Sequence, residues 1–431
     1  MKINIVPTLW PIIFIFIFSA EAAPAWQIFT KNNSPLNGIS LGNLIIDNAN
    51  RIWAGNRWND SIIVFKNGRW YGEAVSEFCG GSCNVINSFL DKDGVACFNI
   101  ANQISAYTAN YSAVKYKGNA FSPVPMLTNC SDWLRADQII ADTANNLLCN
   151  VIISSNMFSS TELGIFRVSA STCSSIVDFQ KADSLIKIAD SSIYVNTSTL
   201  AGAIAVDSNN TLWMTMLAGS DLYQENYGLF HIFGDSITIF NRWNSPLPSN
   251  NVNSIYVDSS NVIWIGIYNA IARLHDTTWT IYSISNSGLQ PSSVLCFKRS
   301  FDGSMWIGTD HGAIRFKNNQ WEAFTTTNSP LPDNWVQQIA EDSSGNIWMA
   351  AGTYLAVYNP NGVNFVSSLL QSRSEHEIAA PISRLVFGFS SRVDQAMSAA
   401  RYFDIRGRDM GRVGFSGQSK GVCIMRRNGA R

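Results

Sequence analysis

The chain is poor in charge and in histidine: 14% of its 431 residues are charged and four are His. It has no HExxH or P-loop motif, so the signatures of zinc peptidases and P-loop nucleotide-binding proteins are missing. Beyond residue 22, no apolar run approaches the roughly 20 residues that a membrane-spanning helix needs. These absences favour a soluble, non-catalytic mature protein.

The amino-terminal segment holds the one long apolar run, from Ile5 to Phe18, between Lys2 and Ala20-Glu21-Ala22. A basic start, an apolar core and small residues around a cleavage point are typical of a secretory signal peptide. An uncleaved anchor is the alternative, but the core is short for a permanent membrane helix. We therefore expect residues 1–22 to be removed and the mature protein to be secreted or displayed at the cell surface.

Export permits disulfide bonds, and six of the eight cysteines cluster in one part of the chain. The candidates for up to three bridges are Cys79, Cys83, Cys97, Cys130, Cys149 and Cys173. Their spacing does not determine the connectivity. A metal site at Cys79 and Cys83 is the alternative, but no second CxxC or HxxxH pair lies nearby. No metal and no cofactor is expected.

What the sequence does contain is an internal repeat. An Asp stands six residues before a Trp in four copies: Asp47/Trp53, Asp207/Trp213, Asp258/Trp264 and Asp342/Trp348. In a fifth copy, Ser300 replaces the Asp before Trp306. Two weaker copies begin at Asp91 and Asp142, and their Trp positions hold Cys97 and Leu148. The clear copies read as four short strands followed by a linker such as Asn328-Ser-Pro-Leu-Pro332.

Seven such units predict an all-β protein, a seven-bladed β-propeller over residues 25–366. Each small sheet can bury its faces only against its neighbours in a ring. We expect the Asp to cap the turn between the first two strands and the Trp to fill the space between blades. Calcium binding is the alternative for the Asp, but the copies lack enough carboxylates for a calcium loop. The isolated strand at 26–29 is expected to complete the seventh blade, with the segment around Phe365 as the competing candidate.

Two stretches resemble the two-component regulator propeller repeat, whose pattern is D-x-x-G-x-I-W-x-G-T followed by G-[LI]-x-R-[FY] and a Trp strand. They run from Asp258-Ser-Ser-Asn-Val-Ile-Trp-Ile-Gly266 to Trp279 and from Asp302-Gly-Ser-Met-Trp-Ile-Gly308 to Trp321. In that family the repeats form the exported sensory part of hybrid histidine kinases. The resemblance implies the propeller fold and a ligand-facing role. This sequence shows no immunoglobulin-like, membrane or kinase segment after the repeats, so direct signalling is not expected.

A polar linker at 367–383 precedes a segment, 384–431, with three strand-like runs and ten basic residues against three Asp. Its Tyr402-Phe-Asp-Ile-Arg-Gly-Arg408 turn and Gly421-Val-Cys-Ile-Met-Arg426 strand resemble the C-terminal sorting domain of the type IX secretion system, a small β-sandwich. The segment departs from that family in its short length and in having Cys423 where an aromatic is usual. The resemblance implies the secretion machinery as a partner. A small carbohydrate-binding or structural module is the alternative, and nucleic acid is not expected as a partner of an exported chain.

Ligands of propellers commonly bind where the loops between the second and third strands and the inter-blade linkers line one mouth of the ring. Aromatic and polar side chains in those segments suit sugar rings or peptide segments, because stacking supplies affinity and polar groups supply direction. The candidate ligand-binding residues are Arg57, Trp58, Tyr223, Tyr227, Tyr268, Asn269, Asp310, His311, Trp335 and Tyr354. For each Trp, packing against the neighbouring blade is the alternative.

The sequence therefore predicts an exported, monomeric binding, adhesion or sensor-like module for an extracellular polymer, such as a glycan, or for a protein. The alternative is a propeller lyase or hydrolase acting on polysaccharide. Its acid and base would come from His311, Asp310 and Glu225, since some lyases share propeller folds.

Overall fold

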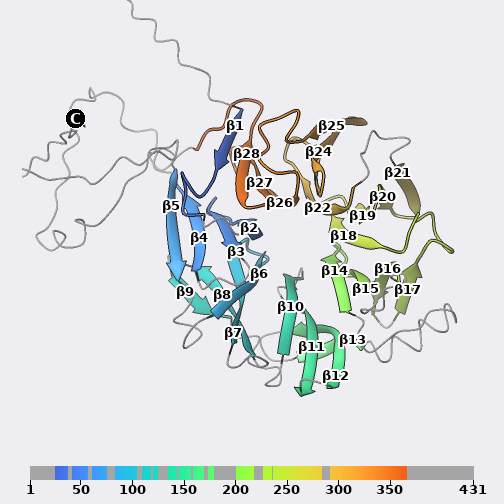
Figure 1. Cartoon of the computed structure of the whole chain (residues 1–431). Coiled ribbons are helices and arrows are strands. Elements are labelled where there is room, and N and C mark those ends of the chain that lie inside the picture. Colours follow the sequence, from blue (N-terminus) through green and yellow to red (C-terminus); the bar gives the residue numbers. More distant parts are fainter. Residues whose placement is uncertain are drawn as a thin grey trace, which may run out of the picture.

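The computed structural model describes residues 25–36, 41–56, 61–74, 83–103, 109–117, 120–124, 134–142, 144, 146–156, 159–168, 173–178, 200–217, 227–234, 236–283 and 292–365. These residues form 28 strands in seven four-stranded antiparallel sheets. Figure 1 shows the sheets arranged side by side around a ring, as the blades of a β-propeller. The predicted seven-bladed, all-β fold is confirmed.

The first four blades follow the chain without interruption in strand order. Blade one contains β2 (Leu41–Ile46), β3 (Ile52–Asn56), β4 (Ser61–Lys66) and β5 (Arg69–Ala74). Blade two contains β6 (Cys83–Leu90), β7 (Ala96–Gln103), β8 (Ala109–Lys117) and β9 (Ala120–Pro123). Blade three contains β10 (Leu134–Ala141), β11 (Leu147–Asn156), β12 (Ser159–Val168) and β13 (Cys173–Asp178). Blade four contains β14 (Leu200–Val206), β15 (Leu212–Leu217), β16 (Leu229–Phe233) and β17 (Ser236–Phe240).

Blades five to seven carry the clearest repeats. Blade five contains β18 (Val252–Val257), β19 (Ile263–Ile267), β20 (Ala270–His275) and β21 (Thr278–Ser283). Blade six contains β22 (Val294–Arg299), β23 (Met305–Thr309), β24 (Gly312–Lys317) and β25 (Gln320–Phe324). Blade seven takes β26 (Val336–Glu341), β27 (Ile347–Ala351) and β28 (Tyr354–Tyr358) from the end of the described chain and β1 (Trp26–Phe29) from its start.

Strand β1 closes the ring by pairing with β28 in antiparallel register, from Trp26 opposite Tyr358 to Phe29 opposite Leu355. Figure 1 shows the first and last strands of the ring in one sheet. The expected closure by the amino-terminal strand is confirmed. The competing candidate, Phe365, instead packs its ring against Phe29 and Phe65. Closure thus joins the two ends of the repeat array within one sheet.

The repeated Asp uses its two carboxylate oxygens for different partners. In blade one, Asp47 Oδ1 accepts the backbone N–H groups of Ala49 and Arg51, each at 3.0 Å. Asp47 Oδ2 accepts the indole N–H of Trp53 at 2.8 Å. The same Oδ2–Nε1 bond measures 3.4, 3.3 and 2.9 Å in the pairs Asp207/Trp213, Asp258/Trp264 and Asp342/Trp348. Turn capping by the Asp is thus confirmed, and the bond to the indole explains the fixed spacing of six residues.

The turn itself demands one special backbone conformation. The third residue after the Asp, or after Ser300 in blade six, adopts a left-handed φ of 56° to 82° at Asn50, Gly94, Asn210, Asn261, Gly303 and Gly345. Only Gly and, less easily, Asn adopt this region at low cost, and these are the two residue types found there. The weaker copies keep the same turn, because Asp91 and Asp142 each cap two backbone N–H groups.

The repeated Trp fills the space between neighbouring blades, as the sequence predicts. Trp53 of blade one is 1% exposed and contacts Phe98 and Tyr116 of blade two at ring distances of 5.3 and 4.6 Å. The Gly two places after the Trp also reflects close packing of blades. A Cβ on Gly308 would lie 2.5 Å from the carbonyl oxygen of Val336 in blade seven. The aromatic residue and the glycine therefore serve the same interface.

The prediction of disulfide bridges among six cysteines can be examined at one of them, Cys97. Cys97 and Cys296 are free thiols, so a bridge through Cys97 is not seen. Burial, together with nearby Asp91, raises the pKa of Cys97 to about 12, and burial raises that of Cys296 to about 12. Both thiols are therefore protonated and unreactive at neutral pH. The side chains of the other five candidates lie outside the described residues, as do the segments 1–24 and 366–431 with the predicted signal peptide and sorting domain.

Among the residues that the structure describes, no helical segment has the length and hydrophobicity to cross a membrane.

Candidate functional site

The loops between the second and third strands form one face of the ring together with the inter-blade linkers, and we call this the loop face. On the loop face the β19–β20 and β23–β24 connections are each hydrogen-bonded to the linker that enters the next blade. The backbone N–H of Asn269 donates to the carbonyl of Ser292, and the backbone N–H of Ser292 donates to Asn269 Oδ1, at 2.9 Å each. The N–H of Gly312 donates to the carbonyl of Asn334 at 2.7 Å. Neighbouring loops are thereby held at fixed positions across blades five to seven.

Asp310 and His311 lie on the β23–β24 loop of blade six, between the loops of blades five and seven. Asp310 Oδ1 lies 2.8 Å from His311 Nδ1 and also accepts the backbone N–H of Ser293 at 2.8 Å. The carboxylate is largely covered, whereas the imidazole side chain is 60% exposed. The Asp therefore orients a His that presents its other ring nitrogen, Nε2, away from the carboxylate.

Two exposed aromatic residues stand on the loops that border this pair. Tyr268 is 56% exposed on the β19–β20 loop, and Trp335 is 49% exposed on the linker into blade seven. The backbone N–H of Trp335 donates to Asp333 Oδ1 at 2.8 Å, and its carbonyl accepts the N–H of Gly352 at 2.9 Å. Trp335 is thus an exposed ring on a well-anchored backbone. Tyr354 follows at the start of β28 and is half-buried.

The structure brings together only part of the predicted site. Tyr268, Asn269, Asp310, His311, Trp335 and Tyr354 lie on adjacent, hydrogen-bonded segments of the loop face. The predicted ligand-binding role of Tyr227 is corrected by its burial: the residue is 3% exposed and packs in a hydrophobic cluster with Ile204, Met214 and Phe230. Its ring is needed to cover the core of blade four, so it offers no face to a ligand. Arg57, Trp58, Tyr223 and Glu225 lie outside the described residues.

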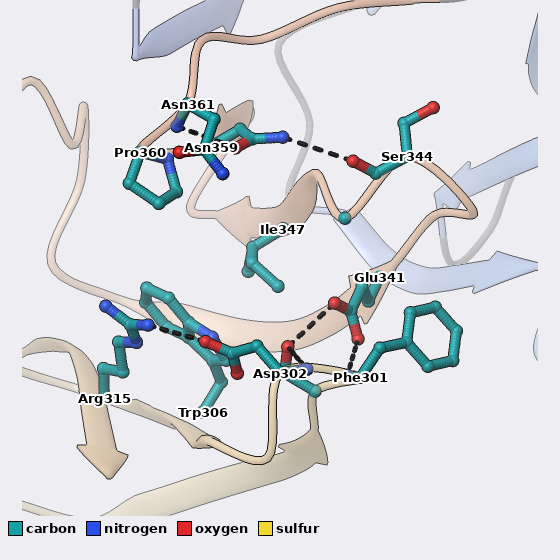
Figure 2. Close-up of a pocket in the computed structure, with 12 residues that line it drawn as sticks. Phe301, Asp302, Trp306, Arg315, Glu341, Ser344, Ile347, Asn359, Pro360 and Asn361 are labelled. Atoms are coloured by element: carbon teal, nitrogen blue, oxygen red, sulfur yellow. Dashed lines mark hydrogen bonds and ion pairs between the residues drawn. The ribbon is translucent and has the colours of Figure 1, made fainter.

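A pocket lies at the other end of the strands, on the face that carries the Asp turns, which we call the turn face. This turn-face pocket sits between blades six and seven and encloses about 190 Å³. Its lining residues are Ser300, Phe301, Asp302, Trp306, Arg315, Glu341, Ser344, Gly345, Ile347, Asn359, Pro360 and Asn361. In Figure 2, Asn359, Pro360 and Asn361 lie across the pocket from Asp302, Trp306 and Arg315, with Ile347 between the two groups.

Glu341 joins the two blades at this pocket. Its Oε1 accepts the hydroxyl of Ser300 and its Oε2 the backbone N–H of Phe301, each at 2.8 Å (Figure 2). Burial raises the pKa of Glu341, although these hydrogen bonds and the charge of Lys298 act in the opposite direction. Burial also lowers the pKa of Lys298. The carboxylate of blade seven thus caps the turn of blade six, where the repeat has lost its Asp.

Asp302 is the anionic group at the opening. It accepts Arg315 Nη2 at 2.7 Å and Lys317 Nζ at 2.9 Å. Burial acts to raise its pKa, but hydrogen bonds from Ser304, Lys317 and Arg315 outweigh burial and hold the pKa well below its ordinary value. Asp302 is therefore ionised and paired at neutral pH.

The turn-face pocket is absent from the sequence predictions, although the sequence carries a signal for it. Ser300 occupies the repeat's Asp position in blade six. Glu341 occupies the position just before the Asp in blade seven, where Ile46, Val206 and Val257 stand in the other blades with an intact Asp–Trp pair. Two departures at aligned positions of neighbouring copies mark an interface that differs from the rest of the ring.

Comparison with known proteins agrees with the fold. The pattern of the two component regulator propeller family matches residues 246–269 and 330–353. The extracellular domain of a protein described as a hybrid two component system from B. thetaiotaomicron has a TM-score of 0.56 at 16% identity, over 84% of this chain and 46% of that one. PorZ, a surface component of the type-IX secretion system of Porphyromonas gingivalis, has a TM-score of 0.54 at 15% identity, over 77% of this chain and 48% of PorZ.

Virginiamycin B lyase from Staphylococcus aureus has a TM-score of 0.50 at 12% identity, over 77% of this chain and 98% of the lyase. The chain spans less than half the length of the first two structures. A search of curated proteins finds no significant match. Identities this low establish the fold alone. The chain is a seven-bladed β-propeller that carries two repeats of the two component regulator propeller type.

Proposed function

We propose that this propeller is a non-catalytic binding module that acts outside the cytoplasm and recognises an extracellular polymer or protein through its loop face. The observation that carries the proposal is the arc formed by Tyr268, the Asp310–His311 pair and Trp335. The Tyr268 loop is bonded to the linker before blade six, and the loop that bears the pair is bonded to the linker that bears Trp335. Two exposed aromatic rings therefore border an oriented polar pair.

This combination suits a sugar ring or a peptide segment better than a small ion. Exposed Trp and Tyr side chains bury large areas on binding and lose little side-chain entropy, which is why they dominate binding energy at interfaces. Asp310 and His311 add hydrogen bonds of defined direction, because the pair is held by the backbone N–H of Ser293. A binding role is also in keeping with the folds compared above, which include an extracellular domain of a two component system and a surface component of a secretion system.

The proposal includes export through the predicted signal peptide, passage by way of the predicted sorting segment at 384–431, and a monomeric mature protein. The secretion machinery is the partner for that route. Two propeller relatives that are extracellular or surface-located support an extracellular site of action. Fractionation of a type IX-competent host that expresses the chain with and without residues 384–431 tests the route, and unchanged surface delivery of the truncated protein argues against it.

Substituting Trp335 by Ala is expected to weaken ligand binding about tenfold or more, because an interfacial Trp commonly contributes over 1–2 kcal/mol. Combined glycan and peptide arrays probed with the purified protein identify the ligand, and titration with the strongest hit measures the loss. Tyr268→Ala is expected to act in the same direction. The matched control is Tyr71→Ala, since Tyr71 is a 45% exposed aromatic on β5, away from the loop face.

Equal binding by wild type and Trp335→Ala would remove the loop face from the proposal. A lyase or hydrolase is the second candidate, favoured by the 2.8 Å contact between Asp310 and His311, in which a carboxylate orients a solvent-facing base. Cleavage of an array-positive polysaccharide by wild type, lost in both Asp310→Asn and His311→Ala, would replace the binding module by the enzyme. Absence of turnover on a polysaccharide panel would rule out the lyase or hydrolase as the function.

A further inference from the structure

The turn-face pocket forms where the repeat's own hydrogen bond is missing. In the four copies with an intact pair, the Trp indole N–H donates to the Asp. In blade six, Ser300 stands at the Asp position and its hydroxyl donates to Glu341. Trp306 is 2% exposed and lines the pocket, and among the described residues the Asp that accepts its indole N–H in the other copies is replaced by Ser300. A donor that lines a pocket and makes no hydrogen bond within the protein is available to an acceptor on a ligand.

A second donor in the pocket is also without a partner. Arg315 donates from Nη2 to Asp302, but its Nε is buried and has no hydrogen-bond partner among the described residues. Arg315 lies opposite Trp306 in the register of β23 and β24, so the two donors come from adjacent strands. Figure 2 shows both side chains on the same wall of the pocket.

Acceptors and an exposed amide complete the polar lining. The Asp302 carboxylate belongs to blade six, and the Glu341 carboxylate of blade seven lies between the two blades. Asn361 is exposed on the opposite rim. Asn359 is fixed by its amide, which donates to Ser344 O and to Asn346 Oδ1 at 3.3 and 3.0 Å. Donors and acceptors thus face one small space.

The apolar part of the lining is aromatic. Phe301 is 76% exposed at the edge of the pocket, and its backbone N–H is anchored to Glu341. The Trp306 ring and Ile347 form the interior wall. An exposed Phe beside a polar pocket offers a flat surface on which a ring with one apolar face can rest.

From this arrangement we infer that the turn-face pocket binds one uncharged sugar unit, with its hydroxyl groups accepting from Trp306 and Arg315 and donating to Asp302 or Glu341. Hydroxyl groups both donate and accept, which matches the mixed lining. The volume of about 190 Å³ is below the roughly 300–1,000 Å³ of pockets for drug-sized ligands and fits a single ring.

Charged and apolar ligands fit less well. An anion would face Asp302 and Glu341, and a cation would face Arg315 and Lys317. A purely apolar ligand would leave the donors of Trp306 and Arg315 unpaired, which costs free energy. The balance of charges around the pocket therefore selects an uncharged ligand with several hydroxyl groups. This inference does not rest on the loop-face proposal, because the two sites lie at opposite ends of β23.

The test is titration of the purified protein with methyl glycosides of hexoses and N-acetylhexosamines, followed by ligand-detected NMR. Wild type is expected to bind at least one glycoside, and the variant Ser300→Asp/Glu341→Gln is expected to lose binding tenfold or more. This variant restores the repeat's Asp, whose carboxylate then accepts the hydrogen bond from the Trp306 indole N–H in place of the ligand. Trp306→Phe and Arg315→Met are expected to weaken binding at least threefold each.

Matched controls separate binding from folding. Trp264→Phe removes the equivalent indole N–H in blade five, where Asp258 is its acceptor, and it should leave glycoside binding unchanged if the fold is intact by circular dichroism. Failure of every glycoside to bind wild type would overturn the inference. Binding that survives in Ser300→Asp/Glu341→Gln, or that is lost in Trp335→Ala instead, would overturn it as well, the latter by placing the sugar on the loop face.

Discussion

Replacing Trp348 by Ala is expected to lower the free energy of unfolding of the propeller by about 3–5 kcal/mol, the range for removing a large buried aromatic. Trp348 is 0% exposed and sits where the ring closes. Its ring stacks on Phe29 of β1 at 5.9 Å with an interplanar angle of 3°, and it contacts Phe65 of blade one at 5.4 Å. The substitution leaves a cavity between blade seven, the closing strand and blade one.

Chemical denaturation followed by circular dichroism measures this loss. The matched control is Trp243→Ala, because Trp243 is 57% exposed on a linker and contacts Arg242 at 4.6 Å. An exposed contact of that kind contributes below about 1 kcal/mol. Similar losses for the two variants would show that the repeated Trp does not carry the packing between blades.

Replacing Asp342 by Ala is expected to destabilise the fold by about 3–5 kcal/mol, although the side chain is small, because several buried donors lose their acceptor. Asp342 accepts the backbone N–H groups of Ser344 and Asn346, the Asn346 amide and the Trp348 indole, at 2.8–3.0 Å. Asn346 and Trp348 are both 0% exposed, so water cannot replace the carboxylate.

Asp91→Ala provides the comparison within the same repeat. Asp91 caps only the backbone N–H groups of Asp93 and Val95, and Cys97 stands at its Trp position. The expected loss is about 1 kcal/mol, the net value of a partly exposed hydrogen bond. Thermal and denaturant unfolding of the two variants measures the difference. An Asp91 effect as large as that of Asp342 would mean that the turn, and not the indole bond, determines the role of the Asp.

The sequence predicts the ring because its signals are local and repeated. A left-handed turn residue, an Asp six places before a Trp and alternating strands occur in one short window, so copies can be counted without knowledge of tertiary contacts. Even the irregular second blade follows, since Asp91 and Gly94 keep the turn after Cys97 has replaced the Trp. Closure by β1 was predictable for the same reason: the strand has the pattern of a fourth strand without the other three.

The sites were harder to predict, because they depend on side-chain exposure and on pairs of neighbouring blades. Tyr227 has the composition of a binding residue, but its place before β16 buries it under blade four. The turn-face pocket needs Ser300 and Glu341 together, two residues 41 positions apart in adjacent copies that are joined by a hydrogen bond. A single repeat cannot indicate such a site, whereas a comparison of aligned positions in adjacent copies can.

Closure of the ring underlies both site assignments, because the loop face and the turn-face pocket each include residues of blade seven. The pair Gln27→Cys and Val357→Cys tests it directly, since these residues are partners in the β1–β28 register. Paired residues of antiparallel strands lie about 4.5–5.5 Å apart at Cα, within disulfide reach. We expect mild oxidation to form this bond, with a crosslinked 27–357 peptide in the digest and a higher melting temperature. Persistently unlinked cysteines in the folded double variant, compared with the two single variants, would contradict a ring closed by β1.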